Sequence, residues 1–198
     1  MISEKFVILG SLLSLWGSIG YAYLTLKGKV KPNRITFSLW ALAPLVAFGA
    51  EINKDVGIQS LMTFMVGFGP LIVLITSFMN KGSYWELKKF DYICGGLSLG
   101  GLALWAITGE GNLAIGFAIL ADGLAALPTV YKSYIAPATE NWLLYFLSAL
   151  SAAITLLTID KWTFAYWGFP IYILAICVLI SALVKFKLGK KFPIKFAI

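Results

Sequence analysis

The chain has no histidine and only 2 cysteines among its 198 residues. Histidine and clustered cysteines are the usual protein ligands of zinc and haem, so we expect neither a metal site nor a cofactor. Cys94 and Cys177 both fall within apolar segments that we predict to be helices, which does not indicate a disulfide framework. Residues 96–100 match the G-x-S-x-G pattern of serine hydrolases, but that chemistry needs a histidine base. We therefore do not expect an enzyme.

Charged residues are also scarce. They make up 13% of the chain, whereas roughly a quarter is typical of soluble proteins. Apolar residues make up 60%, and the mean hydropathy is +0.86. A membrane-spanning helix needs about 20 mainly apolar residues. Segments that meet or approach this length predict an all-α membrane protein with seven transmembrane helices: Phe6–Leu26, Ile35–Ala50, Val56–Met79, Phe90–Thr108, Leu113–Tyr134, Trp142–Ile159 and Trp162–Val184.

Lysine and arginine are unevenly distributed between the two ends of these helices. One side carries only Lys5, Lys54 and Lys161, and the other carries the remaining 13 of 16 basic residues. Basic residues in short loops tend to stay in the cytoplasm, which places the N-terminus outside and the C-terminus in the cytoplasm. We expect an integral protein of a prokaryotic cytoplasmic (inner) membrane, in contact with lipid. The net charge of +7 then needs no nucleic-acid partner, because a basic inner face beside anionic lipid explains it.

The segment 27–55 returns in similar form at 132–160. At an offset of 105, the matching pairs are Lys27 with Lys132, Pro32 with Pro137, Leu39 with Leu144, Leu42 with Leu147, Leu45 with Leu150, Ala47 with Ala152 and Asp55 with Asp160. Farther along, Pro70 matches Pro170 at an offset of 100. This duplication predicts two three-helix units of like orientation joined by a linker helix. The expected boundaries are 1–80 for the first bundle, 81–111 for the linker helix, 112–185 for the second bundle and 186–198 for a basic cytoplasmic tail.

Residues 127–132, Leu-Pro-Thr-Val-Tyr-Lys, lie near the end of the first helix of the second unit and precede a loop proline, Pro137. With the 3+1+3 layout, they resemble the Pro-Gln motif of the SWEET and PQ-loop (MtN3-like) transporter superfamily, with Thr129 where that family usually has glutamine. The resemblance implies a carrier that moves a small polar solute, sugar-like or another metabolite, by alternating access. The same superfamily includes the KDEL receptor, so a membrane receptor or scaffold without transport is the alternative.

Asp122 lies near the centre of the fifth predicted helix, with no basic residue within a turn. A carboxylate at that depth costs several kcal/mol and usually faces a cavity, a partner or a proton path. It could bind substrate or take up a proton during transport, or it could be a structural carboxyl bonded to a neighbouring helix. Thr129 falls on nearly the same helix face, so we expect it to line the same pathway. Lys132, at the end of this helix, could be a snorkelling anchor or a substrate ligand.

Small polar residues form stripes at spacings of three and four on two helices: Ser11, Ser14, Ser18, Tyr21 and Thr25 on the first, and Asn141, Ser148, Ser151, Thr155 and Thr158 on the sixth. Such stripes serve as packing seams or line a water-filled path. In the second case Ser18 and Ser148 would contact the solute. Trp40 and its repeat mate Tyr145 could stack on a ring-shaped solute, or they could belong to the core or to an interfacial belt.

Four prolines fall inside predicted helices: Pro44, Pro70, Pro128 and Pro170. Each removes a backbone hydrogen bond, so each could be a hinge for alternating access or a static kink. The glycines at 95, 96, 100 and 101 favour close packing of the linker helix, either within the chain or as the face of a homo-oligomer.

Overall fold

The computed structural model describes residues 2–108 and 111–192, whose regular elements are all helices with no strand among them. The elements are α1 (Phe6–Leu26), α2 (Arg34–Ile52), α3 (Ser60–Met79), α4 (Lys89–Thr108), α5 (Gly111–Ile135), the 3-10 helix η1 (Pro137–Thr139), α6 (Trp142–Thr158), α7 (Phe164–Phe186) and α8 (Leu188–Lys191). The all-helical prediction is confirmed for this part of the chain. Of the predicted basic tail, residues 193–198 lie outside the described residues, as do residues 109–110 of the predicted linker.

Two predicted segments begin too early. The third was expected from Val56, but α3 starts at Ser60, because Asp55 adopts a positive φ of 55° and turns the chain after α2. The last was expected from Trp162, but α7 starts at Phe164. Elsewhere asparagine caps fix the helix starts: the Asn33 side chain accepts a hydrogen bond from the Thr36 amide, and Asn141 accepts one from the Leu143 amide.

Five of these helices, α1, α2, α3, α5 and α7, are long and apolar enough to cross a membrane, and α6 is a shorter apolar helix. Many large apolar side chains are exposed on the outside of the bundle, among them Trp16, which is 69% exposed, and Phe78, which is 60% exposed. Hydroxyl side chains instead lie inside: Ser14, Ser18 and Thr25 on α1 are all buried. A bundle with an apolar outside and a partly polar inside is suited to lipid, so the chain is an integral membrane protein.

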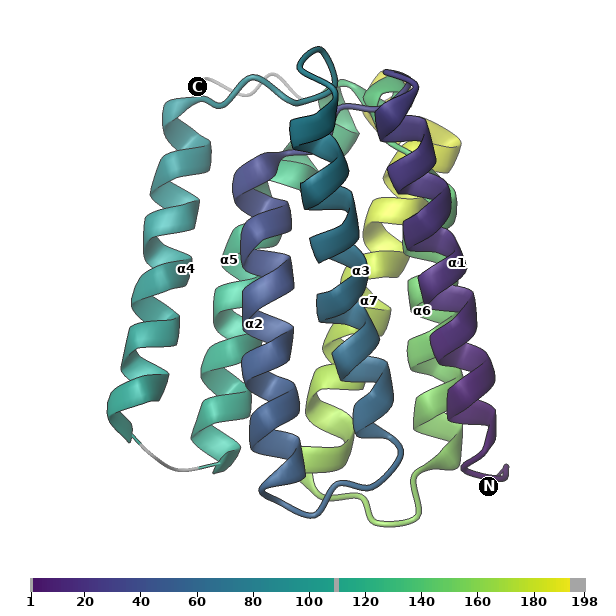
Figure 1. Cartoon of the computed structure of the whole chain (residues 1–198), viewed down its shortest axis with the longest axis vertical. Coiled ribbons are helices and arrows are strands. Elements are labelled where there is room, and N and C mark those ends of the chain that lie inside the picture. Colours follow the sequence, from purple (N-terminus) through teal and green to yellow (C-terminus); the bar gives the residue numbers. More distant parts are fainter. Residues whose placement is uncertain (1, 109–110, 193–198) are drawn as a thin grey trace.

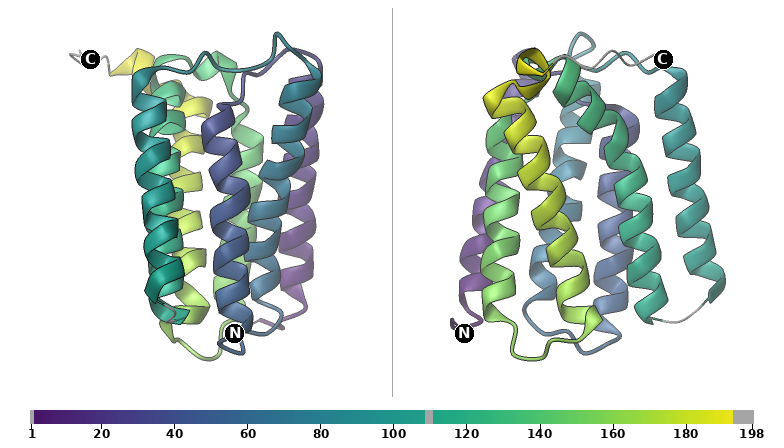
Figure 2. Two further views of the ribbon diagram at one scale, coloured as in Figure 1. Left: turned by 60° about the vertical axis from the view of Figure 1, so that its left-hand side comes forward. Right: turned by 180° about the vertical axis from the view of Figure 1, so that it is seen from behind.

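The helices pack in two layers (Figures 1 and 2). In one layer α3 lies between α1 and α2, and in the other α7 lies between α5 and α6. The layers meet where α1 packs on α6 and α2 packs on α5. Helix α4 stands at the edge, where it contacts α2 and α5 among the described elements.

The α1–α6 seam is tight. A Cβ atom added to Gly10 would lie 3.2 Å from the Ser151 Cα, and one added to Gly17 would lie 3.2 Å from the Leu144 Cα. In α4, by contrast, Gly96 and Gly100 face open space, while Gly101 faces Ala121 of α5.

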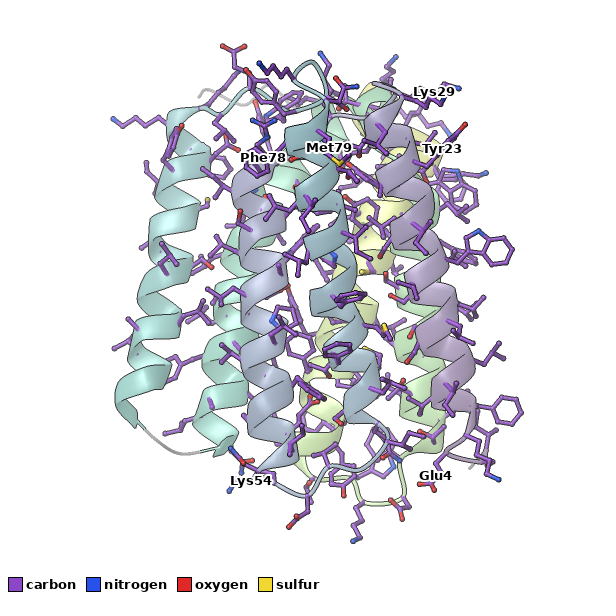
Figure 3. All side chains as sticks on the ribbon, viewed as in Figure 1. Glu4, Tyr23, Lys29, Lys54, Phe78 and Met79 are labelled. Atoms are coloured by element: carbon purple, nitrogen blue, oxygen red, sulfur yellow. The ribbon has the colours of Figure 1, made fainter. Side chains whose placement is uncertain are left out.

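One end of the bundle, called the basic end here, holds the loops 27–33, 80–88 and 136–141 together with α8 (Figure 1). The opposite end holds the N-terminus and the loops 53–59 and 159–163. Lys29 marks the basic end in Figure 3, and Glu4 and Lys54 mark the opposite end. The fold thus gathers most of the lysine and arginine residues of the described chain at one end of the bundle.

Candidate central cavity

A small cavity lies in the middle of the bundle. Its lining residues come from α1, α2, α3, α5, α6 and α7: Ser14, Ser18, Phe37, Trp40, Met65, Val66, Pro70, Asp122, Leu144, Tyr145, Ser148, Ile173, Ile176, Cys177 and Ile180. No described residue of α4 is among them. About 40 Å³ is open to the centres of water molecules, which is room for about three waters.

Among the described lining residues, Asp122 has the one charged side chain, and it is 1% exposed. The Tyr172 hydroxyl donates a hydrogen bond of 2.6 Å to its Oδ2 atom. Its Oδ1 atom has no hydrogen-bond partner among the described residues. The Trp40 indole N–H donates to the Asp122 backbone carbonyl at 3.3 Å, which ties α2 to α5 at this level. The site therefore presents one carboxylate oxygen that the protein itself does not satisfy.

Three aromatic rings stand in contact along one side of the cavity. The ring centroids of Phe37 and Trp40 lie 5.4 Å apart, and those of Trp40 and Tyr145 lie 6.2 Å apart, both in edge-on geometry. Serine hydroxyls complete the polar lining: the Ser14 and Ser148 Oγ atoms lie 3.4 Å apart, and Ser18 donates to the Ser14 carbonyl. The central parts of the two polar stripes thus face the cavity.

A buried ion pair lies between the cavity and the basic end. Lys132, at the end of α5, pairs with Glu140, which follows η1, and both side chains are 0% exposed. The Tyr21 and Tyr145 hydroxyls donate to Glu140 Oε2 at 2.8 Å and 2.9 Å. Tyr145 belongs to both sites, because its ring lines the cavity and its hydroxyl binds Glu140.

Loops cover this ion pair at the basic end. The Lys132 ammonium also donates to the Lys31 carbonyl at 2.6 Å, and the Lys31 amide donates to the Thr139 carbonyl at 2.9 Å. Trp85 places its ring 5.5 Å from the Lys132 ammonium, and its amide donates to the Pro32 carbonyl. Segments from three separate loops therefore meet over the ion pair and close the basic end.

A second buried carboxyl lies toward the opposite end. Glu51, in the last turn of α2, is 1% exposed and accepts a hydrogen bond of 3.0 Å from the Thr63 hydroxyl. Its Oε2 atom has no partner among the described residues. Glu51 lies eleven residues beyond Trp40, about 16 Å along α2, and it does not line the central cavity.

The predicted substrate-binding residues divide into two groups. Asp122, Trp40, Tyr145, Ser18 and Ser148 meet around the cavity. The other two do not reach it. Thr129 is fully buried but absent from the lining, and Lys132 is paired with Glu140 instead of extending to the membrane surface. The interpretation of Lys132 as a snorkelling anchor was wrong, because a buried carboxylate lies within reach of its ammonium group.

The predicted hinge prolines lie one in each of α2, α3, α5 and α7. Pro70 lines the cavity, whereas Pro44, Pro128 and Pro170 are buried in helix contacts. In each case the missing N–H leaves the carbonyl four residues earlier without its usual helical partner.

Sequence reasoning missed Tyr172, Glu140 and Glu51. Tyr172 lies fifty residues from Asp122, and only the packing of α7 on α5 brings the two together. Glu140 follows the turn at Pro137, and its pairing with Lys132 depends on how that turn folds back on α5. Within the described residues, no group of three or more potential metal ligands comes together.

No protein-family model, curated protein or solved structure matches this chain significantly. The physical features of the cavity therefore carry the functional argument.

Proposed function

We propose that the chain is a carrier that moves a small polar solute across the membrane by alternating access of two three-helix units. Helices α1 to α3 form the first unit, α5 to α7 form the second, and α4 is the linker. In this proposal all seven long helices span the membrane, with the basic end in the cytoplasm. We further propose that the chain is a remote relative of the SWEET and PQ-loop superfamily, which the resemblance at residues 127–132 and the 3+1+3 layout support.

The packing pattern supports two equivalent units. The third helix lies between the first and second in both units, so α3 and α7 have the same place. Exchange of the units also converts the α1–α6 contact into the α5–α2 contact, as a two-fold axis along the bundle would require. Helices α4 and α6, with 20 and 17 residues, are about 30 and 26 Å long, close to the hydrocarbon thickness of about 30 Å.

The observation that carries the proposal is the cavity itself. It is lined by all six helices of the two units, and its lining includes Asp122, whose Oδ1 atom has no hydrogen-bond partner among the described residues. A carrier must place its solute site where the two units meet, so that relative motion of the units exposes the site to either side. A buried polar group without a partner is costly in a purely structural core, which favours a role in binding.

The Lys132–Glu140 pair supplies the closed gate of this proposal. In the conformation described here, Tyr21, Tyr145 and Lys132 all hold Glu140 at the basic end. Access from the basic end requires these contacts to separate. Because the Tyr145 ring lines the cavity, arrival of a solute there would act directly on the gate. Pro70, in the cavity wall, is a candidate hinge.

Counterflow in proteoliposomes tests the function whatever ion, if any, is coupled to transport. Vesicles loaded with unlabelled sugars, amino acids, amines or vitamins are mixed with the same labelled solute outside. We expect accumulation of at least one solute, and slower accumulation in Asp122→Asn and Asp122→Ala. Glu51→Gln is the matched control, because it removes a buried carboxyl outside the cavity. Transport that is unchanged in both Asp122 variants would remove Asp122 from the site.

A receptor or scaffold is the second candidate, favoured by the small size of the cavity and the ties that close the basic end. Cysteines introduced at Thr129 and Ser148 distinguish the two. Thiol reagents that never reach either position would favour a receptor, and reagents that reach Ser148 would favour a carrier. In either case, the open face at Gly96 and Gly100 of α4 is the surface that we propose for a homo-oligomer.

A further inference from the structure

The charge in the central cavity is unbalanced. Asp122 contributes a carboxylate, and no lysine or arginine is among the described residues that line the cavity. Lys132 lies ten residues away, about 15 Å along α5, and Glu140 already pairs with it. No described residue of the lining therefore offsets a charge on Asp122, so a ligand that carries a positive charge would be complementary to this site.

Hydrogen bonding at Asp122 shows the same imbalance at the level of single atoms. Tyr172 satisfies Oδ2, while Oδ1 has no donor among the described residues although the side chain is 1% exposed. The nearby polar groups of the cavity wall are engaged elsewhere: the Trp40 N–H binds a backbone carbonyl, and the Tyr145 hydroxyl binds Glu140. A ligand that donates a hydrogen bond would therefore satisfy the Oδ1 atom.

The surroundings of the carboxylate are aromatic. Phe37, Trp40 and Tyr145 form one contiguous cluster in the same cavity wall. Aromatic rings attract cations through their negative faces, and a desolvated site strengthens that attraction. A carboxylate beside aromatic rings in a water-poor cavity is suited to an ammonium group, whereas an anion would meet repulsion from Asp122.

We propose that the solute is a small protonated amine, whose ammonium group donates to Asp122 Oδ1 beside the rings of Phe37, Trp40 and Tyr145. Space for about three waters corresponds to a solute of about three or four non-hydrogen atoms. The serine hydroxyls of the cavity would contact a polar group at the other end of such a solute. The proposed binding of the amine does not depend on transport, whereas its movement across the membrane rests on the proposed carrier function.

Three probes of similar size and different charge test this: ethanolamine, ethylene glycol and glycolate, at matched ionic strength. Affinity is measured with the purified protein in detergent by calorimetric titration and by the ligand-dependent shift of the unfolding temperature. We expect ethanolamine to bind and the neutral and anionic probes to have no effect. Asp122→Asn should weaken ethanolamine binding by at least about 30-fold, since it removes the charged partner of a desolvated ion pair.

Matched variants separate the site from general effects. Glu51→Gln removes the other unsatisfied buried carboxyl and should leave ethanolamine affinity unchanged. Trp40→Leu should weaken binding about 3- to 30-fold through loss of a cation–π contact. Trp16→Leu changes a tryptophan that is 69% exposed on the outside of α1 and should have no effect.

Several outcomes would overturn the proposal: equal binding of ethylene glycol, unchanged ethanolamine affinity in Asp122→Asn, or no ethanolamine binding by the unaltered protein. The last result is expected if Asp122 simply holds a proton. Different results would contradict the proposed carrier function. Ethanolamine that binds through Asp122 but shows no counterflow would contradict transport alone, and counterflow of a neutral solute without amine binding would contradict the amine alone.

Discussion

Replacement of Lys132 by methionine tests the buried ion pair at the basic end. Methionine keeps much of the aliphatic stem and removes the ammonium group. The Glu140 carboxylate would then stay fully buried, with the Tyr21 and Tyr145 hydroxyls as its remaining donors. Two neutral donors do not offset a buried negative charge, so we expect Lys132→Met to destabilise the folded protein strongly.

The full burial of both side chains determines the expected size of this effect. Removal of one partner from a buried ion pair costs about 3–5 kcal/mol of unfolding free energy. For a chain of this length, that corresponds to a fall of roughly 6–20 °C in the unfolding temperature. Glu140→Gln should cost a similar amount, because the buried Lys132 ammonium would lose its negative partner and keep only neutral ones, such as the Lys31 carbonyl and the Trp85 ring. The double variant Lys132→Met with Glu140→Gln has no unpaired charge at this site. Its unfolding free energy should exceed that of Lys132→Met by at least about 1 kcal/mol.

The assay is reversible unfolding in detergent of the four proteins of this double-mutant cycle. Lys191→Met is the matched control, since Lys191 is an exposed lysine of α8 at the same end. A loss below about 1 kcal/mol in Lys132→Met, as for a solvent-exposed pair, would refute the reasoning. Strictly additive losses in the double variant would also refute it.

Three further predictions concern packing and hydrogen bonds. Tyr172→Phe removes the donor to Asp122 Oδ2 and should cost about 1–3 kcal/mol of unfolding free energy, but less in an Asp122→Asn background, as measured by chemical unfolding. Gly10→Leu should lower the unfolding temperature, because its side chain meets the α6 backbone, whereas Gly20→Leu, which faces open space, should not. Equal effects of the two leucines would contradict the tight α1–α6 seam. The Arg34 guanidinium lies 4.4 Å from the ring centroids of both Phe78 and Tyr84. Arg34→Lys should cost about 1–2 kcal/mol of unfolding free energy, because lysine lacks the planar group that stacks on these rings; no loss in thermal unfolding would contradict this role.

Helix positions could be predicted because apolar runs of membrane length are a local property of sequence. The start of α3 could not, since residues 56–59 are mainly apolar like the helix that follows, although they belong to the turn after Asp55. Asp122 could be singled out because a lone carboxylate in an apolar run is costly wherever the helix packs.

Predictions for the rest of the site needed distances along and between helices. Thr129 shares a helical face with Asp122, but seven residues move it about 10 Å along α5, beyond the level of the cavity. The partners Tyr172 and Glu140 come from other elements, and only the packing of α5 against α7 and η1 brings them close. Helical periodicity predicts the side of a helix on which a residue lies. A binding site also depends on the position of that residue along the helix axis and on which other helices pack beside it.

The most direct test of the proposed carrier measures whether the central cavity can be reached from both sides of the membrane. Cys177 lines the cavity and is a native reporter, while Cys94 lies in α4 away from it. Cys94→Ala protein in proteoliposomes is treated with membrane-impermeant thiol reagents from each side in turn. Lys54→Cys and Lys190→Cys mark the two sides, and Cys177→Ala gives the background. We expect modification of Cys177 from both sides, slowed by a bound solute; modification from one side alone, or from neither, would contradict alternating access.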